Sequence, residues 1–211
     1  MKEQSDMTSS IHSNAAKNHV ISNMLRHVPS CGWSMEALSR AVKDAGFAEG
    51  DEHRIFQGSI DQALAHYLKM IDRQVADKLI HIDLSSMRVR DRVATGVMIR
   101  LQEIKEHKEA VRMSLKYLAS PIRSKLALQS LFNTVDMIWY AAGDQATDFN
   151  YYSKRFLLAI VYSATLLYWL DDLSPDCEAT RAYLNRRLDQ VLKIPKFKQR
   201  IKDTFAKFGG S

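Results

Sequence analysis

Apolar residues recur every three or four positions along most of the chain, the spacing that places them on one face of an α-helix. The 211 residues include only 8 Gly and 4 Pro, fewer than a many-turned β architecture needs. We therefore expect an all-α protein. The expected helices are residues 14–28, 35–45, 47–56, 60–82, 86–107, 108–118, 122–142, a central helix that follows Asp148, 175–192, and a last helix after Pro195.

The central helix contains the longest uncharged stretch, from Phe156 to Leu170. As a helix it spans about 22 Å, short of the ~30 Å hydrocarbon core of a bilayer. A helix that is apolar on nearly every side belongs inside a bundle. Just before it, Asp148 can cap the first turn, and Tyr151 and Tyr152 follow among charged residues. An apolar helix with an aromatic, charged start is the strongest functional indication in the sequence.

An apolar cavity around this helix would stabilise a long apolar ligand by ~25 cal/mol for each Å² buried. Ordinary core packing explains each candidate residue equally well, so both interpretations stay open. The candidate lipid-binding residues are Leu131, Val135, Trp139, Phe156, Ile160 and Leu167.

Three short helices followed by a long one, with the stretch WSMEALSRAVKDAG at 33–46, resemble the helix-turn-helix head of TetR-type regulators. There the third helix would enter the DNA major groove, but here it begins with Glu49, Asp51 and Glu52 against Arg54. Carboxylates facing the phosphate backbone disfavour the contacts that supply most affinity for DNA. We therefore expect a TetR-like head that binds no nucleic acid; a TetR-type transcriptional regulator with a hydrophobic ligand pocket is the alternative.

The basic charge is concentrated away from this head. Residues 1–60 carry 6 basic and 7 acidic side chains, whereas residues 88–125 carry 10 and 4 and residues 181–211 carry 9 and 2. We expect four parts: a disordered N-terminus (1–13), the three-helix head (14–59), a helical lipid-binding body (60–192), and an amphipathic membrane-interface helix with its tail (193–211).

The last part places four apolar residues on one narrow helical face and cations around them. Aromatic residues opposite lysines are typical of a helix that lies in a membrane interface, where each cation near an anionic leaflet contributes ~1 kcal/mol. A last bundle helix whose phenylalanines cover the core is the alternative. The candidate membrane-binding residues are Lys193, Ile194, Lys196, Phe197, Lys198, Arg200, Ile201, Lys202, Phe205, Lys207 and Phe208.

Motifs of catalysis are missing from the sequence: it has no HExxH, CxxC, GxSxG, P-loop or GxGxxG pattern. The spacing of Asp171, Asp172 and Asp176 is similar to that of the aspartate motif of prenyl-diphosphate enzymes. Pro175, however, interrupts the helix that would align these carboxylates. A capped helix end, with Asp176 or Ser174 starting the next helix, explains them better. We expect a non-enzymatic protein without metal or cofactor; an isoprenoid-processing enzyme is the alternative from that class. We expect the two cysteines, Cys31 and Cys177, to be free thiols of a reducing compartment; a disulfide between them is the alternative.

Three quoted stretches together resemble the accessory lipid-binding protein family of coenzyme Q (ubiquinone) biosynthesis, which has a TetR-like fold. They are VDMIWYAAGD (135–144), AGDQATDFNYYSKR (142–155) and ATLLYWLDDLSPD (164–176). The resemblance implies a protein that binds an isoprenoid quinone intermediate or phospholipid and presents it to the di-iron hydroxylase of the pathway. It also implies a homodimer. The partner-binding residues that it implies are Ile138, Trp139, Asp148, Tyr151, Tyr152 and Arg155; Tyr151 stands where family members often have Trp.

The N-terminal residues have no apolar signal region, and Glu3 and Asp6 are atypical of a transit peptide. We therefore expect a cytoplasmic protein peripheral to the bacterial inner membrane, or one on the matrix side of the inner membrane in a mitochondrion.

Overall fold

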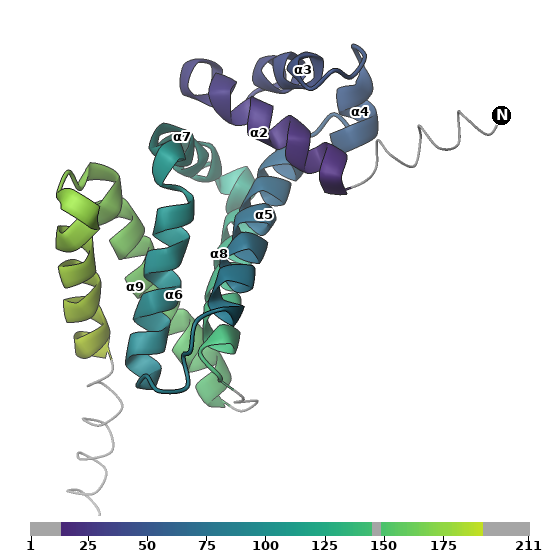
Figure 1. Cartoon of the computed structure of the whole chain (residues 1–211). Helices are drawn as coiled ribbons and strands as arrows, with labels where there is room; N and C mark the ends of the chain where they lie inside the picture. The colour runs from purple at the N-terminus through teal and green to yellow at the C-terminus, as the bar shows by residue number, and fades with distance from the viewer. Residues whose placement is uncertain (1–13, 145–148, 192–211) are drawn as a thin grey trace, which may run out of the picture. The chain divides into compact units, whose positions relative to one another are not determined.

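The structure of the protein is a computed structural model that describes residues 14–144 and 149–191. These residues form α-helices joined by turns and short 3-10 helices, and no strand occurs among them (Figure 1). The all-α prediction is confirmed. The predicted disordered N-terminus (1–13), Asp148 and the whole predicted membrane-binding segment (193–211) lie outside the described residues.

The chain forms two compact units, each made from two stretches of sequence. The first unit is residues 1–81 with 102–134, and the second is residues 82–101 with 135–211. The division falls inside helix α6 (Val89–Glu103) and inside helix α8 (Ser124–Ala141). The head predicted at 14–59 therefore lies wholly within the first unit.

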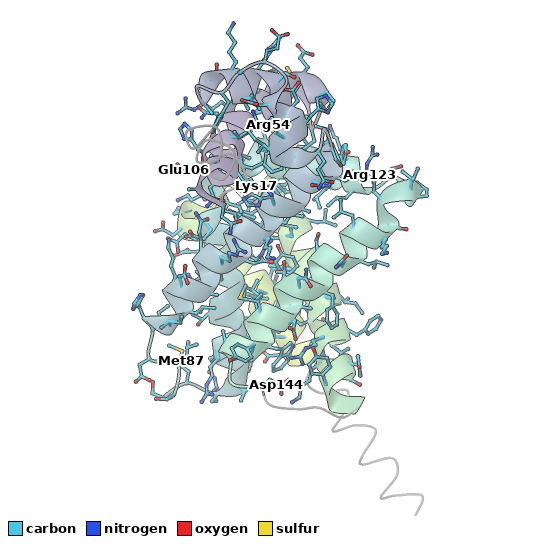
Figure 2. The ribbon with its side chains drawn as sticks, turned by 90° about the vertical axis from the view of Figure 1, so that its right-hand side faces the viewer. Lys17, Arg54, Met87, Glu106, Arg123 and Asp144 are labelled. Atoms are coloured by element: carbon cyan, nitrogen blue, oxygen red, sulfur yellow. The ribbon has the colours of Figure 1, made fainter. Side chains whose placement is uncertain are left out.

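In the first unit, helix α2 packs against α3, α4, α5 and α7. Trp33 closes this core, because its indole N–H donates to the carbonyl of Ala110 at 3.2 Å and its ring lies 5.5 Å from that of Tyr67. Figure 2 labels Lys17 on α2 and Arg54 on α4 of this unit. The elements are α2 (Asn14–Cys31), α3 (Met35–Asp44), α4 (Asp51–Phe56), α5 (Ile60–Ile80), η1 (Lys105–His107), α7 (Lys108–Leu118) and η2 (Pro121–Arg123).

Local sequence explains where two of these helices begin and end. α2 continues three residues beyond the predicted end at Val28, through Pro29, and stops before Gly32. Gly32 adopts φ 66°, a left-handed conformation that glycine takes without steric cost, and its N–H donates to the Val28 carbonyl at 2.8 Å. Ser34 caps α3, since its hydroxyl accepts from the Ala37 N–H at 3.2 Å.

The second unit is built around helix α9 (Phe149–Asp171), followed by η3 (Pro175–Cys177) and a helix over 178–191. Its buried apolar side chains come from α6, the end of α8, α9 and the last helix. Gly96 of α6 allows close packing, because a Cβ there would lie 3.0 Å from the Ile138 side chain. The core includes Val93, Val97, Leu101, Ile138, Leu158, Val161, Tyr162, Trp169, Leu184 and Leu188.

Among the described helices, including α9, none is long and apolar enough to cross a membrane. The sequence argument from the length of the uncharged stretch agrees with this.

Candidate functional site

A compact ion cluster lies where α8 meets the first turns of α9. Arg155 is only 3% exposed, and its Nε donates to Asp136 Oδ1 at 2.5 Å. Its Nη1 donates to Asp144 Oδ2 at 2.9 Å and to the Tyr151 carbonyl at 3.2 Å. Asp144 lies in the turn that follows α8 and is labelled in Figure 2. A buried guanidinium is tolerated here because two carboxylates and a carbonyl satisfy its donors.

Tyr151 is held on this cluster from two sides. The guanidinium carbon of Arg155 lies 3.4 Å from the ring centroid, a close cation–π contact, and the phenol donates to Asp136 Oδ1 at 2.9 Å. The hydrogen bond to Asp136 and burial raise the pKa of Tyr151, so the phenol stays protonated. Burial lowers the pKa of Arg155, but hydrogen bonds to Asp136 and Asp144 outweigh it and raise that pKa.

Lys154 and Trp139 complete the cluster. The Lys154 ammonium contacts Asp144 Oδ1 at 2.7 Å and lies 5.5 Å from the Trp139 ring centroid. The Trp139 indole N–H donates to the Lys154 carbonyl at 3.1 Å. A hydrogen bond to the α9 backbone therefore connects α8 and α9 in addition to the ion pairs. The formal charges of Lys154 and Arg155 balance those of Asp136 and Asp144. The cluster therefore holds the first turns of α9 against α8.

The six residues expected to bind a partner have different environments. Trp139 and Arg155 are buried, Tyr151 is half-buried, and all three belong to the ion cluster. Ile138 is buried against Gly96, and Asp148 lies outside the described residues. Tyr152 is exposed, and its ring stands edge-on to that of Tyr151 at 5.1 Å. Of the described five, Tyr152 is therefore the side chain most open to another molecule.

Half of the residues expected to bind lipid form an exposed face of α9. Phe156, Ile160 and Leu167 are 67%, 51% and 59% exposed. Together with Tyr152 they follow one another at helical spacing, so they share one face of the helix. The other three candidates are elsewhere: Val135 and Trp139 are buried, and Leu131 is half-buried in the first unit.

We call this surface the α9 face: Tyr152, Phe156, Ile160 and Leu167. The charged residues of α9 are Lys154, Arg155 and Asp171, so the helix carries no charge between its second turn and its last residue. Removing such a surface from water is favourable by ~25 cal/mol for each Å² of apolar area buried. An apolar ligand or partner would therefore be stabilised on it.

The far end of α9 holds a second aromatic group. Tyr168 stacks on Tyr183 of the last helix with centroids 4.5 Å apart and rings tilted by 8°, and the Arg187 guanidinium carbon lies 4.9 Å from the Tyr183 centroid. One side of Tyr168 is therefore already covered by a protein ring.

Asp172, the residue just after α9, acts as a helix cap. Asp172 accepts from the N–H groups of Ser174 and Thr180 at 2.8 Å each, and Ser174 accepts from the Ala179 N–H at 3.0 Å. Burial raises the pKa of Asp172, but these hydrogen bonds outweigh it and hold the pKa well below its usual range. The predicted cap by Ser174 is confirmed, and Asp172 joins it. In residues 14–144 and 149–191 no three His, Cys, Asp or Glu side chains are arranged to hold a metal ion.

In the head, two acidic residues of helix α4 form hydrogen bonds and an ion pair at the start of that helix. Asp51 is buried, accepting from the Ala48 N–H at 3.0 Å and pairing with Arg54 at 3.3 Å, while Glu52 accepts from the Gly50 N–H at 3.1 Å. The helix has only 6 residues, and its one arginine is already paired.

Sequence reasoning missed Asp136, Asp144 and Lys154 as members of the ion cluster. Their contacts join α8 and its following turn to α9, and no spacing along a single helix encodes such pairs. The available signal was the clustering of aspartates, cations and aromatic residues in 135–155.

Comparisons with known proteins agree with the family resemblance. Residues 124–195 match the family model COQ9. The chain is 28% identical over 194 residues to "Probable ubiquinone biosynthesis protein coq9, mitochondrial" of Dictyostelium discoideum, covering 89% of this chain and 63% of that protein. It is 26% identical over 195 residues to "Ubiquinone biosynthesis protein COQ9, mitochondrial" of Homo sapiens, covering 89% and 61%. The chain thus spans less than two thirds of these relatives' length, and their names state no reaction.

The fold comparison agrees as well. The crystal structure of the TetR transcriptional regulator from Nitrosomonas europaea ATCC 19718 superposes with a TM-score of 0.67 at 15% identity, covering 84% of this chain and 98% of that one. The TetR-like fold is confirmed, and the similarity to ubiquinone-biosynthesis proteins agrees with the resemblance found in the sequence.

Proposed function

We propose, from this similarity to the COQ9 family of ubiquinone biosynthesis proteins, that the chain is a non-enzymatic lipid-binding accessory protein of that pathway. It binds isoprenoid or quinone intermediates, or phospholipid, at a membrane and presents them to a ubiquinone-pathway hydroxylase. The α9 face is the observation that carries the proposal. It is an uncharged, exposed surface on a helix inside the stretch that matches the family model, and it begins at the aromatic residues expected to meet the partner.

The isoprenoid tail lies along Phe156, Ile160 and Leu167 rather than in a cavity lined by all six candidates. Val135 and Trp139 are buried in the second unit, so they are not part of this exposed surface. Contact between a long apolar chain and an uncharged helical face is favourable, because it removes apolar surface of both from water.

Mass spectrometry tests the lipid directly. The purified full chain should carry isoprenoid quinones or phospholipids into organic solvent. The double variant Phe156→Ser with Ile160→Ser should lose most of this lipid, whereas Ile80→Ser, a change at an exposed isoleucine in the first unit, should retain it. Lipid-free protein from the unchanged chain would refute the proposal.

Membrane association is proposed for residues 193–208. Replacing Phe197, Ile201 and Phe205 by serine should release the protein from anionic liposomes in a flotation assay, because the apolar anchor is lost while the cations stay. The exposed Ile122→Ser variant is the matched control and should still float. Equal flotation of the triple variant would remove the tail from the proposal.

The homodimer is a separate part of the proposal. In the first unit, α8 exposes Leu128 and Phe132, and a second copy is the cover that the family resemblance suggests for them. Light scattering after size-exclusion chromatography should give twice the chain mass, and Leu128→Glu with Phe132→Glu should halve it.

The alternative is a TetR-type regulator with a hydrophobic ligand pocket. The pairing of Arg54 with Asp51 speaks against it, since the one arginine of α4 already has a carboxylate partner and α4 has no lysine. A gel shift with mixed-sequence DNA at low salt decides: a shifted complex that salt dissolves would favour the regulator.

A further inference from the structure

We infer that the first unit carries an anion-binding site where the start of α2 lies against α5. Its ligand class is a phosphate monoester, and the site is independent of the lipid surface proposed on α9. We call it the cationic site; its residues are Lys17, Asn18, His66, Lys69 and Arg73.

A hydrogen bond between two helices holds the centre of the cationic site. His66 Nε2 and the Asn18 side-chain oxygen lie 2.7 Å apart, which joins α5 to α2. The His66 ring also stands edge-on to the buried Phe56 ring of α4, with centroids 5.8 Å apart. The half-buried imidazole is therefore held in place by groups from α2 and α4 before any ligand arrives.

Three cations approach this imidazole from both helices. Lys17, labelled in Figure 2, precedes Asn18 on α2 and is half-buried. Lys69 and Arg73 follow His66 by three and seven positions, so the three side chains leave α5 from one face. Burial, and then the positive charges of the three cations, lower the pKa of His66 to about 4. His66 is therefore neutral at pH 7, and the charge of the site comes from two lysines and an arginine.

No carboxylate of residues 14–144 and 149–191 forms an ion pair with any of these three cations. Other cations of the first unit do have acidic partners, as Arg40 has in Glu36. The first turn of α2 contains no acidic residue, and Asp77, one turn beyond Arg73, is not paired with it. Like charges held close together at a partly buried position repel one another, and a bound anion would relieve that repulsion.

The number of cations favours an anion with more than one charge. A phosphate monoester carries about −1.5 to −2 charges at pH 7 and three acceptor oxygens. The Arg73 guanidinium can bind two of these oxygens at once, and the lysine ammonium groups and the Asn18 amide can donate to the rest. The phosphodiester headgroup of a phospholipid offers the same chemistry with a single charge, so it matches the site less well.

Inorganic phosphate is the first probe, and its dissociation constant for the full chain is measured at pH 7 and constant ionic strength by phosphorus NMR. Lys69→Gln with Arg73→Gln should weaken phosphate at least about tenfold, since both charge-assisted hydrogen bonds are lost. Lys43→Gln with Lys125→Gln removes the same charge at two exposed lysines that do not act on His66, and should change the constant less than about twofold. Equal weakening by the two double variants, or no saturable binding by the unchanged chain, overturns the site.

His66 reports the same event without any substitution in the site. At pH 5 about a tenth of the His66 side chains carry the extra proton, because the pKa is about 4. Saturating sulfate, which keeps both of its charges at this pH, should raise that fraction to about half or more, since a nearby anion favours the imidazolium. NMR of the ring protons, assigned with His66→Gln, measures the fraction in chloride and in sulfate at equal ionic strength. An unchanged fraction overturns the proposal.

Soluble dihexanoyl phosphatidylglycerol distinguishes the two sources of the phosphate group. If its binding is unchanged in Lys69→Gln with Arg73→Gln while phosphate is weakened, the site takes a free phosphate monoester, as inferred. If that double variant weakens the lipid and leaves phosphate unaffected, the site takes a lipid headgroup and the assignment to a free phosphate monoester is overturned.

Discussion

The two faces of α9 have similar composition and opposite environments. One face, with Leu158, Val161 and Trp169, is buried in the core of the second unit, while Phe156, Ile160 and Leu167 on the other are more than half exposed. Burial of the first face contributes to the core of the second unit, whereas within residues 14–144 and 149–191 the second face stays exposed. An apolar surface that stability does not need is the kind that binding uses. The predictions below separate the two faces by the size of their effect on stability.

The largest loss is expected on the buried face. Trp169→Ala should lower the free energy of unfolding by about 3–5 kcal/mol, because it removes a fully buried ring and leaves a cavity. Urea titration followed by circular dichroism measures the change. A loss below 1 kcal/mol would mean that this face is not the core of the unit.

The ion cluster should come next. Asp144→Asn should cost about 2–3 kcal/mol, because Arg155 stays buried with Asp136 as its remaining charged partner. Asp77→Asn, at an exposed position of α5, is the matched control and should change stability by less than about 0.5 kcal/mol. Equal effects of the two changes would contradict the assignment.

The cap after α9 should give a smaller and pH-dependent effect. Asp172→Asn should cost about 1–2 kcal/mol at neutral pH through loss of a charged cap. The pKa of Asp172 is lowered in the folded state, so its stabilisation is present above the unfolded value of about 3.9 and is lost as the pH falls below it. The difference between variant and parent should therefore shrink from pH 5 to pH 3 in parallel urea titrations. A constant difference would show that the carboxylate charge plays no part.

The exposed face should give the smallest change in stability. Phe156→Ser and Ile160→Ser should each alter the free energy of unfolding by less than about 0.5 kcal/mol, since both side chains are already largely in water. The same proteins should lose bound lipid. A large loss of stability in either variant would mean that the face is covered by protein in solution.

Much of the fold could be predicted from local signals. α7 begins and ends where the apolar period and the following Pro121 place it, and Ser34 and Ser59 cap α3 and α5 through their hydroxyls. The end of α2 was missed, because a proline in the last turn stops a helix less strictly than a glycine in the left-handed conformation just after it.

The site was predictable only in part. The sequence located the important helix and its aromatic start, but a stretch that is apolar all round does not reveal which face is buried. Phe156 and Leu158 are indistinguishable by composition, and only packing against other helices separates them. From the sequence alone, Arg155 would be expected at the surface, as most arginines are. It is buried in the structure because Asp136 and Asp144, from α8 and the turn after it, accept hydrogen bonds from its guanidinium.

The interleaving of the two units along the chain has a practical consequence. Since each unit draws on two separate stretches, no single cut yields either one by itself. A fragment ending at residue 134 would contain all of the first unit together with Val93, Val97 and Leu101, three side chains buried in the intact chain. Such a fragment would present these residues to solvent and aggregate, so domain dissection of this protein calls for point substitutions rather than truncation.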